Sequence, residues 1–450
     1  MKASKDYTGA DFFGRESVLK ILLKIAPPVM FAQLIQSLYN MVDSYFVGKT
    51  SDDGLAALSA VYPLQLIIIA LAIGTGVGVN TYMAKQYAIG KTEEADRTAG
   101  TGILLALITW LLFSVIAVLV MAPYAQMSVN SEAAVKYTID YGIIVSVGSL
   151  GIFLESIFTK VHQAYGNMKL PMIAQVVGAL TNIVLDPVLI FGIGAIPALG
   201  IRGAAIATVL GQCTAAVIVG IKGFRKIPKI KDTVPYIKVI YKLGYPSILM
   251  QSLYTVYIGA LNAILAGFCD EAVTVLGLYY KLQSFFFIPL FGLETCIVPV
   301  LSYNYANNDT ERCKKIFGET IIISIVFMVA GILCFELIPT QLIGIFSSNQ
   351  TVKEIGKTAF RIIGISFAPA VYSLTIPIFF QAIGYSKTSA FLSILRQIIC
   401  LVPIFYAFSK IGLDYSWIGF PVAETITDIF GIDFYIAVCR KWKNEKALKR

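Results

Sequence analysis

The sequence has 450 residues, of which 57% are hydrophobic and 14% are charged. A typical soluble domain is about half apolar and about a quarter charged, so this composition excludes an ordinary soluble fold and indicates a polytopic membrane protein. The formal net charge of +9 does not predict a nucleic-acid partner, because the basic residues lie in short loops between apolar runs, where they act as topology signals.

The sequence predicts an all-α membrane protein with twelve transmembrane helices. A helix needs roughly 20 residues to cross a bilayer, and several of the apolar runs are longer, so tilted or kinked helices are expected. The runs lie at residues 24–48, 55–84, 99–121, 134–163, 171–191, 197–222, 238–268, 272–302, 315–337, 352–383, 388–408 and 415–439.

Lys and Arg alternate between the loops on the two sides of these helices. The N-terminal segment, the C-terminal tail and every second loop are rich in basic residues, and the intervening loops contain few. Basic loops stay on the cytoplasmic side of a membrane, so both termini are predicted to be cytoplasmic. No cleavable signal peptide is expected, because Met1–Leu19 is polar.

The chain contains an internal repeat. Residues 24–65 align with residues 242–283 without a gap, at a shift of 218. Six helices separate the paired segments, so the two halves have the same orientation, as in transporters built from two pseudo-symmetric six-helix bundles around a central cavity. The predicted domains are an N-terminal bundle at 1–222, which carries the cation or proton site, a cytoplasmic linker at 223–237 and a C-terminal bundle at 238–450.

The first predicted helix has one polar face in the otherwise apolar segment at residues 27–48. Its four polar side chains are separated by 3, 4 and 3 residues, so they share one helical face. They are Gln33, Gln36, Asn40 and Asp43. A carboxylate at membrane depth is costly unless it faces a bundle interior or a wet cavity, so Asp43 indicates a functional site.

A second acid, Asp186, lies one turn after Asn182 in the fifth predicted helix. Asp43 and Asp186 both lie about 8 Å inside the outer ends of their helices, at 1.5 Å per residue, and Thr208 is a plausible neighbour. Apolar residues replace both acids at the 218-residue shift, so the site is predicted in the N-terminal bundle alone. In one pocket, the two acids would form a negative site that a proton or a cation can neutralise.

Several motifs resemble those of the MATE (multidrug and toxin extrusion) transporters, in particular their DinF/MepA-like prokaryotic branch. The resemblance covers essentially residues 15–440 and rests on the order of the motifs together with the two-bundle repeat. The motifs are PPVMFAQLIQSLYNMVDSYFVG at 27–48, GNMKLPM at 166–172, TNIVLDPVLIFG at 181–192, GIRGAAIATVLGQ at 200–212 and PVLSYNYANNDTER at 299–312.

The resemblance implies secondary active efflux of organic cations or amphipathic drugs, by antiport against Na⁺ or H⁺ through alternating access of two bundles. We expect a monomer in the cell inner (plasma) membrane that contacts lipids, is not an enzyme and needs no cofactor besides the coupling ion. The predicted cation, proton and substrate site consists of Asp43, Asn40, Asp186, Asn182, Thr208 and Gln36. If the ion is Na⁺, Asp43 and Asp186 are its expected ligands.

A candidate second site consists of Glu294, Gln251, Tyr254 and Glu155. Other branches of the family place acids in the seventh and tenth helices, whereas here the seventh helix offers Gln251 and Tyr254. Glu294 in the eighth helix and Glu155 in the fourth either bind a cation or are hydrogen-bonded between helices.

Two other functions remain open. A lipid-linked oligosaccharide flippase needs basic residues for a pyrophosphate, and Arg361 and Arg396 are the notable candidates. An intramembrane enzyme needs a nucleophile–base pair or a metal cluster, and His162, the only histidine, is expected at a wet helix end without such partners. The glycines of GTGVG at 74–78 predict close helix packing, since no GK[ST] follows them, which favours secondary transport over ATP-driven export.

Overall fold

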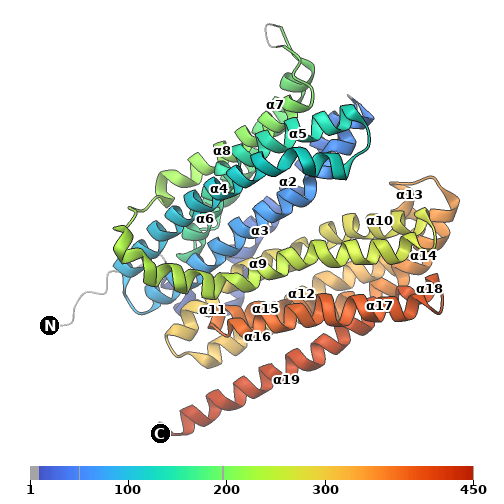
Figure 1. The fold of residues 1–450 in the computed structure, drawn as a ribbon. Helices are drawn as coiled ribbons and strands as arrows, with labels where there is room; N and C mark the ends of the chain where they lie inside the picture. Colours follow the sequence, from blue (N-terminus) through green and yellow to red (C-terminus); the bar gives the residue numbers. More distant parts are fainter. Residues whose placement is uncertain (1–9, 50, 195–196, 449–450) are drawn as a thin grey trace. The chain divides into compact units, whose positions relative to one another are not determined.

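The computed structural model describes residues 10–49, 51–194 and 197–448, apart from the side chains of Asn40, Met41, Ser44 and Asp52. Regular structure in these ranges is helical, and no strand occurs in them (Figure 1). The prediction of an all-α fold is confirmed.

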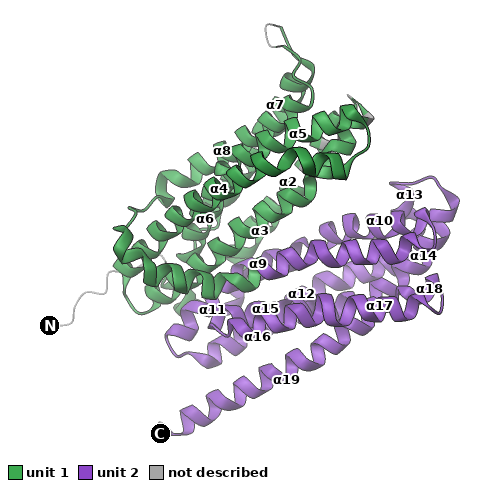
Figure 2. Cartoon of the chain, viewed as in Figure 1, with its two compact units in different colours: residues 1–16, 23–248 green, residues 17–22, 249–450 purple. Residues whose placement is uncertain are grey.

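The chain forms two compact units (Figure 2). Unit 1 comprises Met1–Glu16 and Leu23–Ile248, and unit 2 comprises Ser17–Leu22 and Leu249–Arg450. The first eight helices are α1 (Phe12–Arg15), α2 (Val18–Gly48), α3 (Asp52–Ala88), α4 (Thr92–Ser128), α5 (Glu132–Gly148), α6 (Leu150–Ala164), α7 (Lys169–Phe191) and α8 (Ile201–Gly223). Of the predicted linker at 223–237, Gly223 ends α8, residues 224–229 are not helical, and residues 230–237 begin the next helix.

That helix, α9 (Ile230–Ala266), starts in unit 1 and continues into unit 2. Unit 2 also contains a π-helix, η1 (Leu395–Leu401), between two α-helical segments. The α-helices of unit 2 are α10 (Asp270–Phe286), α11 (Ile288–Ala306), α12 (Thr310–Leu337), α13 (Pro339–Gly344), α14 (Gln350–Ile365), α15 (Phe367–Ile383), α16 (Ser386–Ile394), α17 (Val402–Ser409), α18 (Leu413–Ser416) and α19 (Gly419–Leu448).

Helical segments occupy the positions of the predicted membrane spans. Among the described residues, nine helices are long and apolar enough to cross a membrane, and two bent pairs raise the number to eleven. The segment at the twelfth position, α19, is not among them; it carries Glu424, Asp428 and Asp433 and a basic last part. The chain is therefore a multi-pass membrane protein by the length and composition of its helices.

The two bent pairs have an identifiable cause. The α10–α11 pair bends by 54° and the α14–α15 pair by 52°. Pro289 and Pro369 each lie just after the break, and a proline removes a backbone donor and clashes with the preceding turn. The expected kinks therefore occur where proline interrupts an apolar run.

Within unit 1, α7 and α8 pack with their backbones in close approach. A Cβ atom added at Gly178 would lie 2.7 Å from the carbonyl oxygen of Gly211, and one added at Gly211 would lie 2.7 Å from that of Gly178. Small residues allow such contact between membrane helices. The GTGVG glycines behave similarly, since Cβ atoms at Gly74 and Gly78 would collide with Ile248 and Ile240 of α9. Their predicted role in helix packing is confirmed.

His162 corrects the expectation of a wet helix end, because its side chain is fully buried. Its Nε2 donates a hydrogen bond to the carbonyl oxygen of Val219 at 3.0 Å, so Nδ1 is the acceptor for the Tyr165 hydroxyl. Gly223 of α8 lies against the same imidazole ring. The close approach of α8 to α6, which the sequence pattern of α6 alone does not reveal, removes this histidine from water.

The Gly178–Gly211 contact generates a stability prediction. Gly211→Ala would force α7 and α8 apart and is expected to cost about 1–3 kcal/mol, as overpacking does, even though alanine favours helix. Thermal unfolding of the detergent-solubilised protein measures this. Gly259→Ala is the matched control, because a Cβ there meets nothing within 4 Å. Equal melting temperatures for both variants would contradict the close packing.

Candidate functional site

The two membrane acids of unit 1 come together in the structure. Asp43 of α2 is 8% exposed and Asp186 of α7 is 0% exposed. Their carboxylates lie close enough to interact electrostatically. Oδ1 of Asp43 and Oδ2 of Asp186 are buried and have no hydrogen-bond partner among the side chains that the structure describes. The pair therefore presents two acceptor atoms that a proton or a hard cation can satisfy.

Asn182 connects this pair to α8. Its Nδ2 donates to Oδ1 of Asp186 at 3.3 Å and to Oγ1 of Thr208 at 3.4 Å, and its own Oδ1 is buried without a partner. The Asn182 amide thus holds the Asp186 carboxylate in place and adds a third oxygen acceptor beside it. The Gly178–Gly211 contact brings α7 and α8 close enough for the link to Thr208 to form.

Tyr141 of α5 extends the network. Its hydroxyl accepts a hydrogen bond from Nε2 of Gln65 at 3.4 Å and also contacts Thr208, and its side chain lies within electrostatic range of Asp43. Gln65 comes from α3, so five helices of unit 1 contribute to one buried polar cluster. The acids are therefore held by elements that are far apart in the sequence.

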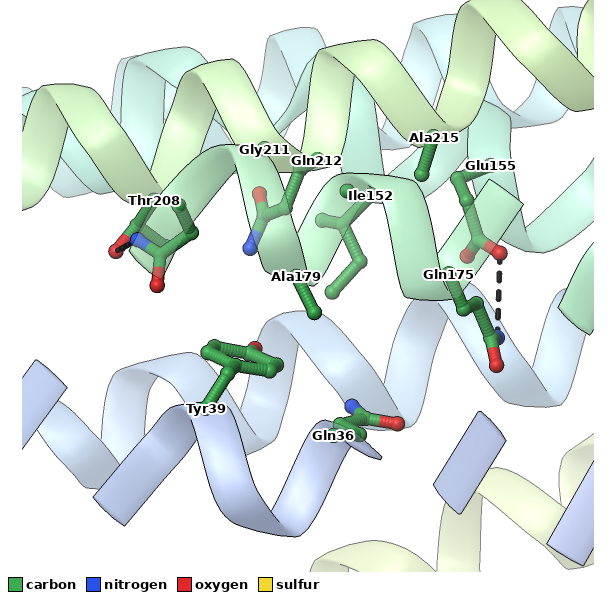
Figure 3. A pocket seen from close by; sticks show the side chains of 12 residues that line it. Gln36, Tyr39, Ile152, Glu155, Gln175, Ala179, Thr208, Gly211, Gln212 and Ala215 are labelled. Carbon is green, nitrogen blue, oxygen red and sulfur yellow. Dashed lines mark hydrogen bonds between the residues drawn. The ribbon is translucent and has the colours of Figure 1, made fainter. Parts of the chain in front are cut away.

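A cavity opens beside this cluster (Figure 3). Its volume is about 80 Å³. Its lining residues come from α2, α6, α7 and α8, and none of them is basic. They are Gln36, Tyr39, Ile152, Glu155, Gln175, Gly178, Ala179, Asn182, Thr208, Gly211, Gln212 and Ala215. The volume holds several water molecules, at about 10–15 Å³ each, but is small beside the roughly 300–1,000 Å³ of drug-sized pockets.

Glu155 lies at the end of this cavity away from Thr208 (Figure 3). Its Oε1 accepts hydrogen bonds from Oγ1 of Thr159 at 2.7 Å and from Nε2 of Gln175 at 3.3 Å. Tyr39 lies within electrostatic range of Asp43, Glu155 and Asp186. The third acid, predicted as part of a separate site, therefore lines the cavity that lies beside Asn182, the hydrogen-bond partner of Asp186.

Gln36 and Asn40 are the two other residues of the predicted first site. Gln36 lines the cavity from α2. The side chain of Asn40 lies outside the described residues. Within those residues no three His, Cys, Asp or Glu side chains could hold a metal ion together, so Na⁺ bound by Asp43 and Asp186 would need neutral oxygens such as Oδ1 of Asn182.

The other members of the candidate second site lie in unit 2. Oε1 of Glu294 accepts a hydrogen bond from Oγ1 of Thr375 at 3.4 Å, and Glu294 lies within electrostatic range of Arg396. Tyr254 packs edge-to-face against Tyr257 and Tyr280, with ring centroids 5.5 and 5.9 Å apart. Gln251, one turn before Tyr254, is half-buried. Glu155 thus lies in a different unit from Glu294, and the four residues do not form one site within either unit.

Arg396 is held by an ion pair. Its Nε donates to Oε2 of Glu424 at 2.8 Å and its Nη2 donates to Oε1 at 2.6 Å, with both side chains buried. The Ser373 hydroxyl donates to the same carboxylate. The other basic flippase candidate, Arg361, donates through Nε to the backbone carbonyl of Glu336 at 3.2 Å. The Arg396 guanidinium is thus occupied by an acid of its own chain.

Some of these residues could have been found in the sequence. Tyr39 precedes Asp43 by four residues, and Gln175 precedes Asn182 by seven, so each shares a helical face with a predicted residue. Tyr141 and Gln65 carry no comparable signal, because they reach the cluster only through the packing of α3 and α5. The Arg396–Glu424 pair joins residues 28 positions apart on different helices.

Removing the Arg396 guanidinium is expected to destabilise unit 2. Arg396→Met leaves the Glu424 carboxylate buried without its partner, which costs on the order of 3–5 kcal/mol. The double variant Arg396→Met with Glu424→Gln should recover most of that loss, because no unpaired charge remains. Thermal unfolding in detergent measures both, with Arg361→Met as the control at an exposed arginine. A double variant no more stable than Arg396→Met would contradict this account.

Comparison with known proteins places these features in a family. The MatE family model matches residues 28–188 and again residues 246–406. The second match begins and ends 218 residues after the first, which is the shift of the internal repeat. The two matches together span more than half of the chain.

Curated relatives resemble the chain over nearly its whole length. Multidrug export protein MepA of Staphylococcus saprophyticus is 24% identical over 424 residues, which cover 92% of this chain and 93% of that protein. An FAD transporter of Shewanella oneidensis is 22% identical over 392 residues, covering 86% and 87%.

The fold also matches a solved structure described as the outward-facing conformation of a multidrug resistance MATE family transporter of the MOP superfamily. Its TM-score is 0.90 at 24% identity, and the match covers 97% of this chain and 99% of that one. The repeated family match, at the period found in the sequence itself, decides the classification: the chain belongs to the MatE family.

Proposed function

We propose that this protein is a multidrug exporter that exchanges cationic or amphipathic compounds for H⁺ or Na⁺. One observation carries the proposal: Asp43 and Asp186 are buried together, each with an acceptor atom that no described side chain satisfies, beside a cavity that has no basic lining residue. Buried acids without donors are costly unless they bind a proton or a cation. The name of the MepA relative, a multidrug export protein, supports the same class of activity.

Coupling follows from competition for one negative site. A proton or Na⁺ neutralises Asp43 and Asp186, and a cationic substrate does the same, so binding of one weakens binding of the other. Exchange results if only the loaded forms change between inward and outward access, through movement of the two units. The cavity of about 80 Å³ is sized for the ion and water, so a drug-sized substrate requires further opening.

The setting of the protein is part of the proposal. We place it in the plasma membrane with both termini in the cytoplasm, because alternate loops are basic. We propose that it acts as a monomer, contacts lipids, binds no nucleic acid, carries out no enzymatic reaction and uses no cofactor besides the coupling ion. The organic substrate and the ion are its small-molecule partners.

Anionic substrates fit the site less well. A lipid-linked pyrophosphate needs basic groups, and Arg396 is held by Glu424 while Arg361 donates to a backbone carbonyl. An FAD-like substrate, suggested by the name of the Shewanella relative, carries negative phosphates that Asp43, Asp186 and Glu155 would repel. The acidic character of the cavity therefore favours an organic cation over either alternative.

The acid pair gives the central test. Asp43→Asn and Asp186→Asn are each expected to reduce uptake of a fluorescent cation into inverted proteoliposomes to the level of empty liposomes, under either a Na⁺ or a pH gradient. The reason is that an amide cannot exchange a proton or neutralise a cation. Asp140→Asn is the control in the same unit, because its ion pair with Arg202 is partly exposed.

Two outcomes would contradict the proposed function. Full ion-driven transport by both variants would show that the pair does not couple ion and substrate. Wild-type liposomes that respond to neither gradient but bind a lipid-linked sugar would favour the flippase.

Glu155 gives a separate prediction about substrate charge. Glu155→Gln is expected to raise the KM for a cationic substrate about tenfold, equivalent to about 1.4 kcal/mol of lost charge-assisted attraction. The KM for a neutral amphipathic substrate should not change. Transport at varied substrate concentration measures both, with the exposed Glu132→Gln as the control. Equal effects on the two substrates would assign Glu155 to packing rather than to charge recognition.

A further inference from the structure

Helices α7 and α8 of unit 1 meet through backbone contact, whereas the equivalent segments of unit 2 are joined by an ion pair. At the 218-residue shift, Gly178 of α7 corresponds to Arg396 of η1, and the start of α8 at Ile201 corresponds to the start of α19 at Gly419. In unit 1 this pair of helices meets through glycines, whereas in unit 2 an arginine reaches across to Glu424. Arg396 therefore places a charged side chain at the position where unit 1 has a glycine in helix–helix contact.

Both carboxylate oxygens of Glu424 accept hydrogen bonds, whereas the nearby Asp428 has an unsatisfied oxygen among the described residues. Both oxygens of Glu424 accept from Arg396, and Oε2 also accepts from Ser373. Asp428 lies one helical turn further along α19 and is 8% exposed. Its Oδ1 is buried without a hydrogen-bond partner in the described part of the chain, although the side chain lies within electrostatic range of Arg396 and Glu424.

The charges of this cluster do not balance. Glu294 of α11 also lies within electrostatic range of Arg396, so three carboxyl groups surround one guanidinium. Within the described part of unit 2, the other ionisable groups in electrostatic range of Arg396 or Glu424 are Tyr257, Tyr279 and Cys400, which are neutral at physiological pH. Full ionisation would leave two uncompensated negative charges in a buried site, which is strongly unfavourable.

The π-helix offers a way for Arg396 to change partners. Pro403 follows η1 and cannot donate the backbone hydrogen bond that would continue an α-helix back to Ile399. The wider turn of a π-helix is often found at functional sites. Arg396 lies in this segment, and η1 packs against α19, which carries Glu424 and Asp428.

We propose that Asp428 is a proton-binding site of unit 2, and that its protonation state sets the partner of Arg396. With Asp428 protonated, Arg396 pairs with Glu424 as in the structure. When Asp428 releases its proton to water, its carboxylate attracts Arg396 away from Glu424. This site is separate from Asp43 and Asp186 and does not depend on the function proposed for them.

Infrared difference spectroscopy of the full-length protein tests this directly. A protonated carboxyl group has a carbonyl band that a carboxylate lacks, so acid-minus-alkaline spectra report protonation without requiring transport. One carbonyl band is expected to disappear in Asp428→Asn and to remain in Asp433→Asn, an exposed acid on the same helix. Asp428→Glu should keep the band at a shifted frequency, which covers the case in which the asparagine variant does not fold.

Three results decide the outcome. Acid-minus-alkaline spectra of folded Asp428→Asn that match the wild type would overturn the proposal. A band that Na⁺ removes at constant pH would also overturn it, because a metal ion and not a proton would then be the ligand. Persistence of the Asp428 band in the double variant Asp43→Asn with Asp186→Asn would support it.

Spectra and transport of the wild-type protein together separate this inference from the proposed function. A titrating Asp428 band in a wild-type protein without ion-driven transport would support the inference and contradict the antiporter. Ion-driven transport by a wild-type protein that lacks the Asp428 band would support the antiporter and contradict the inference.

Discussion

Charge buried in an apolar interior has to be compensated, and each unit meets this constraint in its own way. In unit 1 the acids Asp43 and Asp186 lie together without a basic partner, held by Asn182 and the network behind it. In unit 2 the Glu424 carboxylate is paired with Arg396 inside the protein. Among the described residues, the first arrangement supplies no basic side chain for its two acids, and the second supplies one guanidinium for the Glu424 carboxylate.

The two clusters can be compared directly because of the internal repeat. Each involves the last two long helical segments of its half. The reciprocal approach of Gly178 and Gly211 brings α7 against α8 and allows the link from Asn182 to Thr208. The residue at the Gly178 position of unit 2 is Arg396, whose side chain needs room and a partner. The same repeat therefore has a cavity lined by amides and by Glu155 in one half and a buried ion pair in the other.

Much of the site could be predicted along single helices. The spacing of Gln36 and Asp43, and of Asn182 and Asp186, reflects a helical face and can be read without a structure. Glu155 and Glu294 lie in different units, so their grouping in one site stays a prediction. Tyr141 and Gln65 were missed, since no regular spacing connects α3 and α5 to the acids, and His162 was misplaced because α8 covers it.

The sequence by itself determined the all-α membrane class, the 218-residue repeat and the confinement of Asp43 and Asp186 to one half. The class follows from composition and helical periodicity, and the repeat and the confinement follow from comparing one half of the sequence with the other, so none of them requires knowing which helices touch. Only the tertiary structure decided which side chains meet across helices: Glu155 with the cavity of Asn182, Arg396 with Glu424, and Asp428 with no hydrogen-bond partner for one buried oxygen. Such contacts depend on how closely and at what rotation helices pack, and helical periodicity does not specify either.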